Sequence, residues 1–113
     1  MLTRIFCAVL VLVGSAHANS ENIIPLRKEV VVEVGQAMIV NGFRGECGKR
    51  PANVDPKRTR ATKLGTLSVG KWGMKNSGRC GGLTPAIEVI FTATKKGRET
   101  IEVNGDKISV TVK

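Results

Sequence analysis

The basic side chains of this chain are concentrated between two cysteines, Cys47 and Cys80. Residues 49–79, here called the basic insert, hold nine Lys and Arg residues against one acid, whereas residues 19–46 carry three against four and residues 81–113 carry five against four. Because such a density of cations attracts negative charge, we expect the insert to bind an anionic partner. The residues expected to contact that partner are Arg58, Arg60, Lys63, Lys71, Trp72 and Lys75.

The spacing of these residues is that of a surface attractive to polyanions, with four cations between 57 and 63 and two more flanking Trp72. The ring of Trp72 is suited to stacking on a sugar or a base beside the cations. The alternative is that it is buried against a Cys47–Cys80 bridge. For the charges themselves, the alternative is a solvated loop that keeps a basic protein soluble.

The N-terminal segment 1–18 has the features of a secretory signal peptide. It has a positive residue at Arg4, an apolar run over 5–13, and a small-x-small cleavage site at Ala16-His17-Ala18. The apolar run is too short to span a bilayer, and no later stretch approaches the roughly 20 apolar residues that a membrane helix needs. We expect 1–18 to be removed and 19–113 to form a single secreted or periplasmic domain without a transmembrane segment; the alternative is a buried N-terminal strand.

Removal of this segment leaves two cysteines and no histidine, since Cys7 and His17 both lie within it. A pair of cysteines in an oxidising compartment most often forms a disulfide, so we predict a Cys47–Cys80 bridge. A bridge across a loop of this length stabilises a fold by about 4 kcal/mol in the chain-entropy model. A redox or metal pair is disfavoured because there is no Cys-x-x-Cys motif and no imidazole partner.

The composition of the chain disfavours an enzymatic function. Without histidine, the Ser-His-Asp and Cys-His arrangements are excluded. Ser68 with Lys71, and Ser77 with Lys75, leave Ser-Lys chemistry open, although such pairs are common in basic loops. The glutamates fall mostly at predicted solvent-facing strand positions, and no GxGxxG, P-loop or calcium-loop motif is present. We therefore expect a protein that is not an enzyme and has no cofactor and no metal site.

The partners that suit an exported basic domain are envelope glycolipid phosphates, an acidic polysaccharide or an acidic protein surface. Nucleic acid is chemically compatible, but an exported protein rarely meets it. The second hypothesis is a small secreted inhibitor or interaction protein that inserts its disulfide-anchored loops into an enzyme cleft. A steep loss of binding with salt favours an anionic partner, whereas binding through a few hot-spot residues with little salt dependence favours the inhibitor.

Strand patterns dominate the sequence, and no segment has a helical apolar period. Residues 29–34 alternate, with Val30, Val32 and Val34 on one face, and Gly35 predicts a bulge or tight turn. Strands are expected at 29–34, 36–40, 64–69 and 86–94, and the composition between 41 and 85 predicts loops around one or two short strands. The expected core consists of Val30, Val32, Ile87, Val89, Phe91, Ile101, Ile108 and Val110.

The clearest local signal is Asn104-Gly105, which predicts a two-residue type I′ turn between strands at 98–103 and 106–112. This register places Ile101 opposite Ile108 on the buried face. On the other face it pairs Glu102 with Lys107 and Thr100 with Ser109, and both pairs are favourable.

The last third of the chain carries a family resemblance, through Ile87–Thr94, Lys95-Lys96-Gly97, Glu99–Val103 and Ile108–Val112. These residues resemble the closing strands of bacterial immunoglobulin-like β-sandwich modules, which implies a small antiparallel all-β sandwich. This chain departs from the pattern of antibody domains, which place a buried tryptophan shortly after the first cysteine and a tyrosine two residues before the second. The strand–Gly–strand ending is also similar to that of secreted chagasin-type protease inhibitors, but their Arg-Pro-Trp segment is missing and inhibition is not implied.

Overall fold

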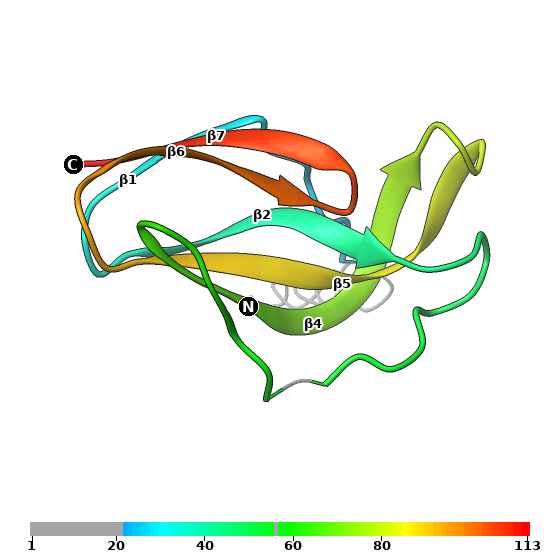
Figure 1. The fold of residues 1–113 in the computed structure, drawn as a ribbon. Helices are drawn as coiled ribbons and strands as arrows, with labels where there is room; N and C mark the ends of the chain where they lie inside the picture. The colour runs from blue at the N-terminus through cyan, green and yellow to red at the C-terminus, as the bar shows by residue number, and fades with distance from the viewer. Residues whose placement is uncertain (1–21, 56) are drawn as a thin grey trace, which may run out of the picture.

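The structure, a computed structural model, describes residues 22–55 and 57–113; the predicted signal peptide at 1–18 lies outside the described residues. The described part is all β and contains no helix, and therefore none long and apolar enough to cross a membrane. Two sheets face each other (Figure 1). The strands are β1 (Glu29–Val32), β2 (Ala37–Arg44), β3 (Arg60–Ala61), β4 (Gly65–Ser77), β5 (Gly82–Ala93), β6 (Gly97–Val103) and β7 (Asp106–Val112).

One sheet has the order β1-β7-β6 and the other the order β2-β5-β4-β3. All named neighbours are antiparallel except β1 and β7, which run parallel from the pair Glu29 and Ser109 to the pair Val32 and Val112. The sequence pattern predicted a purely antiparallel arrangement, and this part of the prediction is wrong for the β1–β7 pair. The turn after β1 carries the chain across to the facing sheet, so β1 occupies the open edge of β7 instead of pairing with β2.

The C-terminal hairpin has the predicted register. Ile101 lies opposite Ile108, Glu102 opposite Lys107 and Thr100 opposite Ser109. Asn104 and Gly105 have φ angles of 55° and 85°. A type I′ turn requires positive φ at both central residues, so the local sequence alone is sufficient to place β6 against β7.

All eight side chains predicted for the core are buried, and Phe91, Ile108 and Val110 have no exposed surface. Seven of them belong to the hydrophobic core between the sheets, whereas Ile87 is buried outside it, opposite Trp72 of β4. Val34 was expected on the same buried face, but this prediction is wrong, because Val34 is 46% exposed. The reason is that β1 ends at Val32 and the chain turns at Gly35, whose φ is 94°.

The basic insert contains a longer strand than its composition predicts. β4 has 13 residues and pairs with the 12 residues of β5 along nearly its whole length. The register shifts between Val69 and Trp72, and in Figure 1 the outer part of this hairpin bends away from the rest of the sheet. Glycine is required at position 70, because the Cβ of any other residue would lie only 2.5 Å from Oε1 of Glu88 and would clash with it. Oε1 of Glu88 accepts a hydrogen bond from the backbone N–H of Lys71 at 2.9 Å.

The β6–β7 turn provides a test of the local argument. Gly105→Ala should lower the free energy of unfolding by roughly 1–2 kcal/mol, because an L side chain is strained at positive φ. The cost is purely conformational, since a Cβ at this position would meet no atom within 4 Å. Urea unfolding of the variant measures the effect.

Gly78→Ala is the matched control. Gly78 also has open space around it, but it is not among the glycines with positive φ. This variant should be neutral or slightly stabilising. Equal destabilisation by both substitutions would contradict the strain argument.

Candidate functional site

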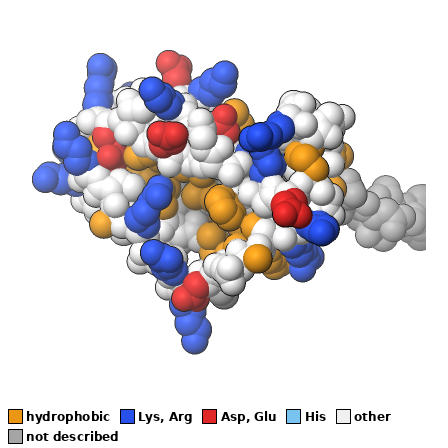
Figure 2. Space-filling model, turned by 45° about the vertical axis from the view of Figure 1, so that its right-hand side comes forward, with side chains coloured by type: hydrophobic (Ala, Val, Ile, Leu, Met, Phe, Trp, Pro, Cys, Tyr) orange, Lys and Arg blue, Asp and Glu red, His pale blue; other side chains and the backbone are white. Residues whose placement is uncertain are grey.

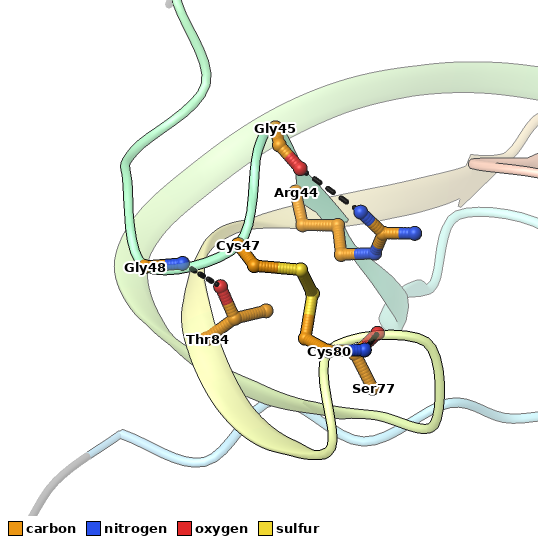
Figure 3. Close-up of a disulfide and its surroundings, with 7 residues drawn as sticks. All are labelled: Arg44, Gly45, Cys47, Gly48, Ser77, Cys80 and Thr84. Carbon is orange, nitrogen blue, oxygen red and sulfur yellow. Dashed lines mark hydrogen bonds between the residues drawn. A yellow bond between two sulfur atoms is a disulfide. The ribbon is translucent and has the colours of Figure 1, made fainter.

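The two cysteines form the predicted disulfide. Cys47 follows β2 and Cys80 lies at the tip of the β4–β5 hairpin, with their Cα atoms 5.5 Å apart (Figure 3). Nearby hydrogen bonds fix the same loop: the N–H of Gly48 donates to Oγ1 of Thr84 at 2.9 Å, and the guanidinium of Arg44 donates to the carbonyl of Gly45 at 2.9 Å. The disulfide and these bonds attach the start of the basic insert to the bent hairpin.

Most cations of the insert are exposed. Of the nine, Lys49 pairs with Glu46 at 3.6 Å and Lys75 is buried. The others make no ion pair within the described part of the chain. They are Arg50, Lys57, Arg58, Arg60, Lys63, Lys71 and Arg79. These seven cations are therefore exposed to solvent and form no direct ion pair with a described acid.

Trp72 is not fully buried, although one of the two alternatives for it required full burial. It lies in β4 opposite Ile87 of β5 and is half-buried. The guanidinium of Arg50 lies 4.5 Å from the centre of its ring. At this distance the contact is a cation–π interaction, worth about 0.5–1 kcal/mol at an exposed site. One face of the ring is therefore occupied by a cation of the protein itself.

Lys75 is an internal residue and does not belong to an exposed cationic surface. It is 6% exposed, and its ammonium donates to Oδ1 of Asn41 and to the carbonyl of Gly42, both at 2.9 Å. Oδ2 of Asp106 lies 3.8 Å from Nζ. Burial lowers the pKa of Lys75 below its ordinary value of 10.5; Asp106 opposes this effect, and Arg44 adds to it.

The partners of Lys75 could not be predicted from the sequence because they lie on two other strands, β2 and β7. Asn41 is in β2 and is fully buried, and its amide also donates to the carbonyl of Val103 at 3.1 Å and to Asp106 at 3.1 Å. No pattern in the sequence indicates an internal lysine, because Lys75 lies in the stretch 41–85, whose composition predicts loops.

A hollow of about 350 Å³ opens between the two sheets beside the segment that leads into β3. We call it the apolar hollow; its apolar lining is Phe43, Val54, Leu67, Val69, Val89 and Val103. Arg58 and Arg60 border it, together with the carboxylates of Asp55 and Glu102. Figure 2 shows hydrophobic side chains exposed in the middle of this face, with basic and acidic side chains around them.

Two of the predicted binding residues line this hollow. Arg58 and Arg60 both border the apolar hollow, and Arg60 is positioned by a hydrogen bond from its Nη2 to the carbonyl of Glu102 at 3.3 Å. Lys63, Lys71 and Trp72 are not part of its lining. The arrangement can hold a ligand that has an apolar part and an anionic part, because hydrophobic surface and guanidinium groups adjoin.

Comparison of the chain with protein-family models, with curated proteins and with solved structures finds no match. Within residues 22–55 and 57–113, no three His, Cys, Asp or Glu side chains are grouped so that they could hold a metal ion.

Removal of the disulfide should lower the stability of the protein. Replacing both Cys47 and Cys80 by Ser should lower the free energy of unfolding by about 4 kcal/mol, because the unfolded chain regains the entropy of a closed loop. The loop spans a sequence separation of 33 residues. Urea unfolding of the wild type with and without reductant should reproduce the difference, and an unchanged midpoint in the variant would contradict it.

Burial of Lys75 should make the free energy of unfolding depend on pH. Because its pKa is lowered in the native state, the unfolded state binds more protons between that lowered pKa and 10.5. The free energy of unfolding contributed by Lys75 should therefore rise with pH through this window. The rise should be absent in Lys75→Met, which should also be less stable at neutral pH by roughly 1–3 kcal/mol because Asn41 loses a partner.

The measurement is urea unfolding of both proteins at a series of pH values from neutral to 10.5. The chain has no tyrosine, and the remaining lysines are the same in both proteins. The difference between the two curves therefore reports Lys75. Parallel curves would show that the ammonium is not desolvated.

Proposed function

We propose that this protein is an exported, non-enzymatic binding module that holds an amphipathic anion, of the kind found in envelope glycolipids, at the apolar hollow. The observation that supports this proposal is the position of Arg58 and Arg60 beside an apolar lining. A hollow of about 350 Å³ lies within the size range of small-molecule sites, which are mostly apolar with a few placed polar groups.

A glycolipid suits this site better than a polysaccharide or an acidic protein surface. The apolar lining is formed by side chains of both sheets, so an acyl chain would extend the hydrophobic core. The guanidinium groups of Arg58 and Arg60 match the geometry of phosphate oxygens. The carboxylates of Asp55 and Glu102 on the same rim are suited to accept hydrogen bonds from sugar hydroxyls. A polysaccharide would leave the apolar lining without a partner.

We further propose an immunoglobulin-like arrangement for the sandwich. Such domains place strands A, B, E and D in one sheet and C, F and G in the other. The order β2-β5-β4 corresponds to B-E-D, and β6 and β7 correspond to F and G. The segment between β2 and β3 would then replace strand C. It leaves the edge of β6 uncovered, and the apolar hollow lies at that edge.

Export is part of the same proposal. It is supported by the signal-peptide features of residues 1–18 and is compatible with the Cys47–Cys80 bridge, since disulfides persist in oxidising compartments. The second candidate function, insertion of a cross-linked tip into an enzyme cleft, is supported by Leu83. This residue is 50% exposed in the β4–β5 hairpin near the disulfide. The two functions place binding at different parts of the molecule.

The proposed function is tested with dodecyl phosphate below its micelle concentration, measured by calorimetry. Arg58→Ser with Arg60→Ser should weaken binding by about tenfold or more, because two charge-assisted contacts are lost. The thermal stability should be nearly unchanged, since exposed charges contribute little to folding. Added salt should weaken wild-type binding and reduce the difference between the two proteins.

Phe43→Ser is the second variant, and it should weaken binding by a similar factor at every salt concentration, because Phe43 is 40% exposed and contributes apolar surface. The matched control is Lys95→Ser with Lys96→Ser, which removes the same charge from the β5–β6 connection. If the control weakens binding as much as the arginine variant, only net charge matters and the site is not at the apolar hollow.

A further inference from the structure

A second hollow lies between the end of β2, the outer part of the β4–β5 hairpin and the β6–β7 turn. It measures about 290 Å³ and is lined mainly by polar side chains. Three cations border it, Arg44, Lys75 and Arg79, against one carboxylate, Asp106. We call it the cationic hollow.

The single carboxylate is already engaged. Oδ2 of Asp106 accepts the amide N–H of Asn41 at 3.1 Å and lies 3.8 Å from the ammonium of Lys75. Arg44 and Arg79 make no ion pair with any described residue. A guanidinium has five N–H donors, and the one hydrogen bond of the Arg44 side chain within the described residues goes to the carbonyl of Gly45 (Figure 3). The hollow therefore has an excess of positive charge and of unused donors.

The closeness of Arg44 to Lys75 is itself unfavourable. Lys75 is 6% exposed, and the charge of Arg44 disfavours its protonated form. Two like charges in a partly desolvated region raise the free energy of the folded state. An anion in the hollow would lower that free energy, because it would face both cations at once. This is the electrostatic environment of a site that is completed by a ligand.

We propose that the cationic hollow binds a small oxyanion, namely the phosphate or sulfate group of a free ion or of a larger molecule. Arg44 supplies the planar fork that pairs with two oxygens, and Arg79 approaches from the tip of the hairpin. Lys75, held by Asn41 and Gly42, supplies charge. Gly78 leaves room in the lining, because even an added Cβ would meet no atom within 4 Å.

This site is distinct from the apolar hollow. None of its three cations lines the apolar hollow, and Arg44 lies outside the basic insert. Asn104 borders both hollows from the β6–β7 turn. The oxyanion site therefore stands or fails independently of the proposed amphiphile, and substitutions at Arg58 and Arg60 should leave it unchanged.

The test titrates the protein with inorganic phosphate at low millimolar concentration and constant ionic strength, with backbone amide shifts as the readout. We expect saturable shifts at Gly78, Arg79 and Asn104. In Arg44→Met the dissociation constant should rise by about tenfold to hundredfold, because a charge-assisted contact is lost. Arg44→Lys should bind with intermediate affinity, because the charge remains but the fork is lost. Arg79→Ser provides a second variant at an exposed position.

Lys95→Ser with Lys96→Ser is the control for net charge and should bind as the wild type does. A parallel titration with glycerol phosphate identifies the source of the oxyanion: tighter binding of the ester indicates a phosphate carried by a larger molecule, and tighter binding of the inorganic ion indicates the free anion. Shifts that do not saturate, or that persist unchanged in Arg44→Met and Arg79→Ser, would overturn the proposal.

Discussion

The polar bridge between Lys75, Asn41 and Asp106 determines how the two sheets meet at one end of the sandwich. Lys75 is in β4, Asn41 in β2 and Asp106 at the start of β7, so the bridge joins the facing sheets through a buried and a part-buried hydrogen bond and an ion pair. Unlike apolar contacts, such bonds have strict geometry, and a partner left without its bond costs about 1–3 kcal/mol. The bridge therefore fixes the β6–β7 turn relative to the bent hairpin. Both hollows border that turn, and their shapes depend on its position.

The parts of the fold that the sequence predicted are those determined by neighbours along the chain. The Asn104-Gly105 turn sets its own register, and the alternation in β7 identifies its buried face without reference to other segments. In β5 the alternation holds only from Val89 to Ala93, because Glu88, which was expected to face solvent, is 7% exposed. The length of β4 was not predictable in this way. Its second half, from Gly70 to Ser77, is rich in Gly, Lys and Asn, and it is a strand because β5 pairs with it and because Glu88 satisfies the backbone at the register shift.

Some features of the candidate site can likewise be predicted from the sequence, and others depend on tertiary contacts. The excess of cations between the cysteines is visible in the sequence, and the disulfide follows from the count of cysteines. Which cations act together depends on contacts between distant segments. Arg58 and Arg60 border one hollow, whereas Lys75 is buried beside Arg44, a residue outside the basic insert. Trp72 likewise contacts Arg50 through space, and no periodicity in the sequence relates those two positions.

The parallel pairing of β1 with β7 has a consequence for how the chain acquires its structure. Among the described residues, β1 and β7 are the first and last strands and are neighbours, so the three-stranded sheet needs segments that are far apart in the sequence. Contacts of such large sequence separation form slowly, because the intervening chain must first be ordered. A chain that emerges from its N-terminus onward cannot close this sheet until its last residues are available. Until then, β1 and its valines remain accessible to chaperones and to other chains.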